Sequence, residues 1–414
     1  MEPKIKSGKT QNLKILLKKF KDIASIDKDG CLVYTSFEFF IIEWIFLSMI
    51  EFGSDLNVAS KRSILSSSIK KVIEDNNFDE NYFIEQVISF AGEHNRIEEK
   101  EYILLTAISV SKLPFRVIKL GESIIQIHGR QYPALFKKSR ETVLKKNSFK
   151  KEKISLTKLT VKVKAKDYRD AYSKAFDCLE IFRAFLCLFL NPSFELRFAQ
   201  REAKPLNKIL RGEVATLHTL DGQMANEKFF YFLRDYKDPE IVILDNRQQD
   251  FLRKTLKRCF KQFNNCRPKL QTTLSKALVS YVDAFDETSM HAAFIKTWRA
   301  IEVLTKTDQN DILIKRCLSL YNKDGKDIER LMLEAIRIFR NEYIHEGNVD
   351  QDPSLACYHL QGIIYNLVVR YNLHLSGFFN SIDDSVIFLD NMQLDKSLLV
   401  NRKRIIDKAL KSKK

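Results

Sequence analysis

The chain has 414 residues, of which 45% are hydrophobic and 29% charged, with only 12 Gly and 8 Pro. These values exclude collagen-like, low-complexity and largely disordered proteins, and the length predicts two or three globular domains. The formal net charge of +16 is concentrated, because residues 1–22, 137–166 and 395–414 carry +5, +10 and +6 while the rest of the chain is net −5. Such segments are expected where surfaces attract a polyanion, and solvated charged faces with a frayed tail give the same pattern.

The seven cysteines are odd in number, scattered and without a C-x-x-C pair, which argues against a disulfide framework and against a zinc site. The first residues lack the apolar segment of a secretory signal. No apolar stretch approaches the roughly 20 residues that a membrane-spanning helix needs. We therefore expect a cytoplasmic protein with reduced thiols, no metal, no cofactor and no membrane partner.

Hydrophobic periodicity predicts an α+β fold in successive regions. Residues 1–100 form a helical N-terminal region, because apolar residues recur there at three- and four-residue steps. Residues 101–247 form a mixed α/β region that we interpret as a sensor or partner-binding part. Its predicted strands are 103–110, 117–120, 124–127, 194–198, 213–217 and 240–244, and its predicted helix is 168–190.

One strand in this middle region is predicted from strict alternation. Leu159, Val161, Val163 and Ala165 share one face, and Thr160 with three lysines shares the other. The lysines are Lys162, Lys164 and Lys166. They are candidates for contacts with RNA phosphates, and the alternative is that a lysine row protects an edge strand from aggregation.

Residues 248–390 are predicted to form an all-helical domain, followed by a basic tail over 391–414. Its predicted helices are 250–263, 269–285, 291–305, 311–321, 327–343 and 353–375. Pro268 and the pair Asp352-Pro353 mark helix starts, with Asp as N-cap and Pro at the first helical position. In the tail, Arg402, Lys403 and Arg404 are further candidates for RNA contacts.

The segment 335–347 carries the side chains most suited to chemistry. On a helical wheel Arg337, Asn341 and His345 follow one another at four-residue steps, with Arg340 at their flank. The apolar stripe of the same helix is Met332, Ile336, Phe339 and Tyr343. Gly347 is suited to end this helix, which places His345 in its last turn.

The pattern Arg340-Asn341-x-x-x-His345 resembles the R-N-x-x-x-H form of the motif of HEPN-domain ribonucleases. The upstream helix, with Trp298, Ile301, Glu302 and Leu304, is similar to the W-x-x-I-E-x-L helix of Apea-like HEPN proteins. The likeness covers roughly residues 270–385. It implies a C-terminal HEPN helical bundle, a homodimer formed through that domain, and a metal-independent endoribonuclease. It also implies anti-phage abortive infection, with RNA such as tRNA as substrate and a phage-derived trigger or operon partner.

The residue types suit cleavage by attack of a ribose 2′-OH on the adjacent phosphate. His345 can move protons near neutral pH, and the permanently charged Arg340 can stabilise the charge that develops on phosphorus. Asn341 would orient the imidazole or bond a phosphate oxygen, and Arg337 would add a second phosphate contact. Glu302 is expected to pair with Arg337 or with Arg340.

Two other interpretations of the same residues are open. The domain can be a catalytically silent HEPN module that binds nucleotide or RNA or acts as a scaffold. The chain can also be a basic nucleic-acid-binding regulator in which Arg340 and His345 are structural. Arg211 and His218 match the looser R-x(4-6)-H spacing as well, but in a strand-like context without the following Asn, and we do not expect them to be catalytic.

Overall fold

The computed structural model describes residues 2–29, 32–36, 38–52, 56–149, 155–191, 204–233, 237–347 and 352–413. The chain is α+β with a helical C-terminal region, as the periodicity predicts. It divides into two compact units. The first comprises Met1–Ile103, Val163–Ala175 and Leu217–Asn226, and the second comprises Leu104–Lys162, Phe176–Thr216 and Glu227–Lys414.

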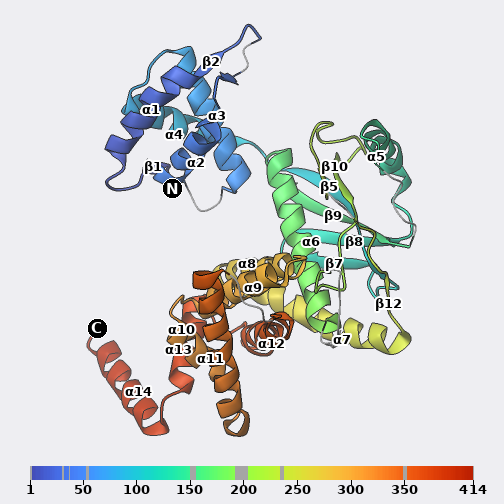
Figure 1. Ribbon diagram of the computed structural model, residues 1–414, viewed down its shortest axis with the longest axis vertical. Helices are drawn as coiled ribbons and strands as arrows, with labels where there is room; N and C mark the ends of the chain where they lie inside the picture. The colour runs from blue at the N-terminus through green and yellow to red at the C-terminus, as the bar shows by residue number, and fades with distance from the viewer. Residues whose placement is uncertain are drawn as a thin grey trace. The chain divides into compact units, whose positions relative to one another are not determined.

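The N-terminal helices of the first unit surround one apolar core (Figure 1). They are α1 (Thr10–Ile23), α2 (Glu38–Met49), α3 (Val58–Glu74) and α4 (Glu80–Arg96). Phe20, Phe46 and Phe83 are almost fully buried in this core, and their rings contact one another in series. Asn57 and Asp79 cap α3 and α4 by accepting backbone N–H bonds. The helical prediction is confirmed for this region.

Short strands that periodicity did not predict complete the N-terminal region. β1 (Lys4–Ile5) pairs with β4 (Ile50–Glu51), and β2 (Ala24–Ile26) pairs with β3 (Leu32–Tyr34), both antiparallel. Segments of two or three residues are too short to show a two-residue period, which is why the sequence pattern missed them.

The middle of the chain supplies a six-stranded sheet with the order β11-β10-β5-β9-β8-β7. Its strands are β5 (Lys100–Ile108), β7 (Val117–Leu120), β8 (Ser123–Gly129), β9 (Thr157–Ala165), β10 (Val214–Thr219) and β11 (Phe230–Phe232). The expected strand 103–110 is divided, because β6 (Val110–Ser111) pairs instead with β12 (Val242–Ile243). The expected strand 194–198 lies outside the described residues. Two helices accompany the sheet, α5 (Ala134–Lys146) and α6 (Tyr168–Leu190), and α6 has the predicted bounds.

The alternating strand β9 does not lie at an edge. It is between β5 and β8, so the interpretation of its lysines as guards of an edge strand is wrong. Its apolar face is buried as predicted, with Leu159 and Val161 fully so. The opposite face is also covered at its start, because Thr160 is only 3% exposed and its hydroxyl lies 2.9 Å from Nε2 of His128.

The C-terminal part of the second unit is helical (Figure 1). Its α-helices are α7 (Asn246–Asn265), α8 (Pro268–Phe285), α9 (Met290–Thr305), α10 (Asn310–Leu318), α11 (Lys323–Glu346), α12 (Ser354–Tyr365), α13 (Ile382–Met392) and α14 (Lys396–Lys411). Pro268 is the first residue of α8, as predicted. The start of α12 is one residue later than predicted, but Asp352 still accepts the backbone N–H of Ser354. Trp298, Tyr281 and Phe294 are fully buried in this region.

The expected helix 353–375 changes type along its length. After α12 the chain continues as the π-helix η1 (Asn366–Leu373), in which the backbone makes wider turns. The side chain of Asn372 donates to the backbone carbonyl of Leu367 at 2.9 Å, and this bond helps to satisfy the widened backbone.

The predicted basic tail contains the helix α14 over residues 396–411. No residue of α14 is buried. Among the described residues, no helix has both the length and the apolar character needed to cross a bilayer.

Candidate functional site at the end of helix α11

The candidate residues lie where the C-terminal half of α11 packs against α9. Phe339 contacts Phe294 edge-on, with ring centroids 5.1 Å apart, and Tyr343 stacks on His291 at 4.7 Å. The apolar stripe that holds α11 includes Leu333, Ile336 and Phe339. Met332, which the helical wheel placed in the stripe, is 38% exposed, so the stripe begins one residue later than predicted. This packing fixes the polar side of α11 relative to α9.

Arg340 lies beside two residues of α9. Its guanidinium carbon is 5.7 Å from the centre of the Trp298 ring, and Nη2 is 3.4 Å from Oε1 of Glu302. The side chain keeps 23% of its surface exposed, whereas Glu302 keeps 6%. Nε of Arg340 has no hydrogen-bond partner among the described residues. Nε is buried, so another anion could reach the cation only through the 23% of the side chain that stays exposed.

Glu302 joins two arginines. Its second oxygen, Oε2, accepts from Arg299 at 2.6 Å, and Oε1 faces Arg340. The sequence left open whether Glu302 pairs with Arg337 or with Arg340, and the structure shows Arg340. Arg337 pairs with Asp311 of α10 at 3.7 Å instead.

Asn341 contacts its neighbour and not the imidazole. Nη1 of Arg340 donates weakly to Oδ1 of Asn341 at 3.5 Å. No bond joins Asn341 to His345 within the described part of the chain. The role of Asn341 in orienting the imidazole stays a prediction.

His345 is exposed in the last turn of α11. The helix ends at Glu346, and Gly347 adopts a left-handed conformation with φ of 73°, as its role as terminator predicts. Across the described ranges, no hydrogen bond or ion pair engages the imidazole. His345 is therefore open to solvent at the C-terminal end of the helix.

The two groups of candidate RNA-binding cations differ in exposure. On β9, Lys164 is exposed and Lys162 is partly buried. Lys166, the residue after β9, donates to the backbone carbonyl of Asn95 at 3.1 Å. On α14, Lys403 and Arg404 are exposed. Arg402, on the same helix, donates to Asn391 at 2.9 Å.

The second Arg and His pair has a structural environment. His218 is fully buried in β10. Arg211 forms an ion pair with the buried Glu180 at 3.3 Å and lies over the Tyr231 ring. Both side chains are engaged in protein contacts, as the strand-like context suggested.

Sequence reasoning missed two polar clusters of the second unit. In the first, Arg183 is fully buried between Glu180 and Asp286, which is 103 residues distant in the chain. In the second, Nε2 of His359 on α12 lies 2.7 Å from Oε1 of Glu329 on α11. The sequence pattern did not predict either cluster, because a single charged residue on an amphipathic helix does not indicate which distant residue it will contact.

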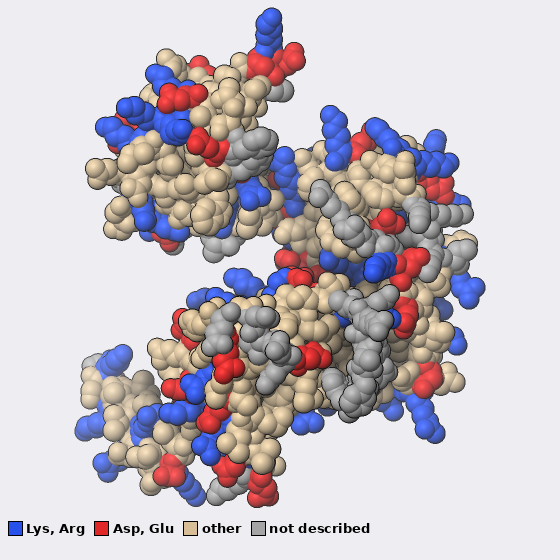
Figure 2. Space-filling view, in the orientation of Figure 1, with Lys and Arg blue, Asp and Glu red and all other residues tan. Residues whose placement is uncertain are grey.

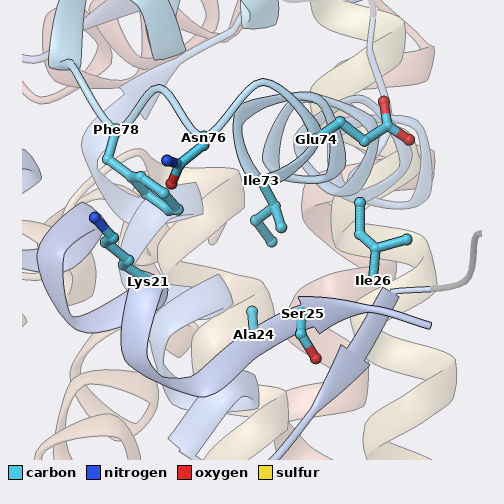
Figure 3. Close-up of a pocket in the computed structure, with 8 residues that line it drawn as sticks. All are labelled: Lys21, Ala24, Ser25, Ile26, Ile73, Glu74, Asn76 and Phe78. Carbon is cyan, nitrogen blue, oxygen red and sulfur yellow. The ribbon is translucent and has the colours of Figure 1, made fainter.

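A shallow hollow in the first unit was also not foreseen (Figure 3). Ala24, Ser25 and Ile26 of β2 form one wall, and Ile73 and Glu74 of α3 form the opposite one. Lys21 lies at its rim with Nζ 5.5 Å from the centre of the Phe78 ring. Its lining includes none of the candidate residues. Among the described residues, no group of three or more His, Cys, Asp or Glu side chains is arranged to hold a metal ion.

Comparison with known proteins gives no match. No model of a protein family, no curated protein and no solved structure matches the chain.

Proposed function

We propose that the chain is a metal-independent endoribonuclease of the HEPN type that cuts RNA at the end of α11. His345 transfers protons to and from the ribose 2′-OH and the leaving oxygen, and Arg340 stabilises the charge on the pentavalent phosphorus. Glu302 positions Arg340 from the α9 side. Arg337 and Asn341 contribute further phosphate contacts.

The observation that carries this proposal is the pairing of an open imidazole with an incompletely bonded guanidinium near the end of one helix. A purely structural arginine with its charge on Glu302 would be expected to use its remaining donors within the protein. Arg340 keeps 23% of its side chain exposed and makes only two long contacts, at 3.4 and 3.5 Å, and His345 is exposed. A phosphodiester is an anion that complements both groups.

The experiment is incubation of the purified chain with total RNA in EDTA. Cleavage that leaves 2′,3′-cyclic phosphate ends is expected, and it is expected to disappear in His345→Ala. The matched control is His374→Ala, because His374 is also exposed and follows directly after a helix end. RNA binding without cleavage would favour the catalytically silent module or the regulator, and unchanged cleavage in His345→Ala would remove the assignment.

The proposal includes a homodimer, because one chain supplies one such histidine and the reaction uses both an acid and a base. A second apolar stripe on α11 supports this part. Ile328, Leu331 and Ile338 lie at helical steps on its outer side and are 63%, 56% and 52% exposed. A copy of the chain that covers this stripe would bury aliphatic surface along α11, the helix that carries the site. Light scattering on Leu331→Asp tests it, and full activity of a monomer would contradict it.

The biological role we propose is growth arrest in anti-phage defence. A phage-derived trigger or an operon partner would activate the nuclease, and tRNA is the first substrate to test. This part rests on the resemblance of the motif. Expression of the wild-type chain is expected to arrest growth, and His345→Ala is expected not to. Equal toxicity of the two would contradict it.

A further inference from the structure

Helix α14 is a continuous helix that nothing in its own chain covers along its described residues. All of its described side chains are exposed, and none is buried. An isolated helix of 16 residues is marginal in water, because most helical stability in proteins comes from burial of an apolar face. Its exposed apolar face therefore indicates an external surface on which it rests.

The apolar face of α14 is aliphatic. Leu398, Ile405 and Ile406 recur at seven- and eight-residue steps, and Leu399 and Leu410 widen the same stripe. Ile405, Ile406 and Leu410 are 59%, 58% and 63% exposed. Arg402 interrupts the stripe, but its guanidinium turns back to Asn391 and leaves its aliphatic stem along the face.

The rest of the helix is strongly basic. The cations of α14 outnumber its one acidic residue, Asp407, and Figure 2 shows them at the lower left along the helix. They are Lys396, Arg402, Lys403, Arg404, Lys408 and Lys411. Lys403 and Lys408 flank the apolar stripe on its two sides, from which long side chains can extend to a charged layer while their stems contact apolar material.

We propose that α14 binds the surface of an anionic lipid bilayer, lying in the plane of the interface. The aliphatic stripe enters the boundary between headgroups and acyl chains, and the flanking cations contact the phosphates. This differs from the sequence-based expectation that no membrane is involved, and it does not rest on the proposed nuclease. Nothing in it requires a spanning helix.

Charge and surface chemistry favour this occupant over two others. Bound RNA would neutralise the cations but would leave five aliphatic side chains in water. A second copy of α14 would cover the aliphatic stripe but would bring two strongly cationic helices together. An anionic bilayer satisfies both faces of the helix.

The experiment is co-sedimentation of the full chain with vesicles of phosphatidylcholine, alone or in an equimolar mixture with phosphatidylglycerol. Binding is expected only to the mixed vesicles. The double variant Ile405→Gln/Ile406→Gln keeps every charge and is expected to bind at least roughly tenfold more weakly, because it removes buried aliphatic surface. Lys403→Gln/Arg404→Gln is expected to lose about fivefold for each cation removed.

A matched control places two glutamines outside α14. Ile243 and Ile387 are 67% and 58% exposed, and Ile243→Gln/Ile387→Gln is expected to bind vesicles as the wild type does. Cleavage of RNA without vesicles is expected to be equal in the wild type, Ile405→Gln/Ile406→Gln and Ile243→Gln/Ile387→Gln, so failure here is distinguishable from failure of the proposed nuclease.

Three outcomes would overturn the inference. One is equal sedimentation with neutral and anionic vesicles. Another is unchanged vesicle binding in the double isoleucine variant, which would show that charge alone acts. The third is a change of oligomeric state in that variant without vesicle binding by the wild type, which would identify a second copy as the occupant.

Discussion

Two arginines of the second unit, Arg183 and Arg340, are both paired with glutamate, and the way their donors are used separates them. Arg183 is fully buried, and all three of its nitrogens donate. Nε and Nη2 bond the carbonyl of Ile209 at 3.2 and 2.8 Å, and the terminal nitrogens bond Glu180 and Asp286. Arg340 has two contacts, at 3.4 and 3.5 Å, and an Nε without a partner among the described residues.

The difference teaches how to distinguish a structural cation from one available to a ligand. A buried charge must have its hydrogen bonds satisfied within the protein, since unpaired burial costs several kcal/mol. Arg183 meets this condition, because all three of its nitrogens donate to protein acceptors and none is available to a ligand. Arg340 is positioned by Glu302 and Trp298 through long contacts and keeps 23% of its side chain exposed, which is the state expected of an anion-binding group.

The largest expected effect is on stability, at Arg183. Arg183→Met leaves the buried Glu180 with Arg211 as its only cation and leaves the partly buried Asp286 without its cation. It is expected to lower the free energy of unfolding by about 3–5 kcal/mol. Urea unfolding followed by circular dichroism measures it. Arg340→Met is the comparison variant, with an expected loss below about 1 kcal/mol, because its ion pair is partly exposed. Similar losses in both variants would break the distinction.

Next in size is the effect on cleavage at Arg340. Arg340→Gln removes the charge but keeps a hydrogen-bonding side chain, and it is expected to lower the rate of RNA cleavage by about 10²–10³-fold. The rate is measured with a fluorescent RNA under single-turnover conditions, alongside the unfolding curve. A variant that cleaves normally would place Arg340 with Arg183 among the structural cations.

A smaller effect is expected at Glu302, which positions Arg340 without touching substrate. Glu302→Gln is expected to lower cleavage by roughly tenfold, as the loss of a supporting partner does. The control is Arg299→Gln, because Arg299 bonds the other oxygen of Glu302 but is 68% exposed. Its cleavage rate is expected to stay within about twofold of wild type. Equal losses of cleavage rate in the two variants would show that the changes disturb all three residues, Glu302, Arg299 and Arg340, and do not act through Arg340 alone.

The smallest effect sharpens the comparison through pH. Burial alone would raise the pKa of Asp286, but the charge and hydrogen bonds of Arg183 hold that pKa below its ordinary value. The stabilisation by ionised Asp286 is therefore complete above the unfolded pKa near 3.8 and declines as pH falls through the lower folded pKa. The difference in unfolding free energy between wild type and Asp286→Asn is expected to be larger at pH 6 than at pH 3. A difference that grows on acidification would contradict it.

Local patterns predicted the long elements well. Helix α6 begins at Tyr168 and ends at Leu190 as predicted, because a long 3.6-residue period is followed by the Asn191-Pro192 pair. Gly347 likewise predicted the end of α11, and so the place of His345 in its last turn. Both features depend on residues that are adjacent in the chain, so they can be predicted from a single sequence.

Features that depend on distant partners could not be predicted. The alternation of β9 is the same for an edge strand and an interior strand, and only its pairing with β8 and β5 distinguishes them. Asp286 gives no local sign that it meets Arg183. The choice of Glu302 between Arg337 and Arg340 was also undecided, because it depends on the rotation of α11 against α9.

The π-helix η1 has a consequence for how this chain tolerates changes in length. Each α-helical residue turns the chain by about 100°, and a π-type turn accommodates one residue more than an α-type turn. Loss of a single residue between Asn366 and Leu373 would let the segment close as ordinary α-helix, with only part of one turn lost. A one-codon deletion in this segment would therefore keep α13 and α14 close to their present rotational phase, whereas the same deletion in an α-helical turn would rotate them by about 100°.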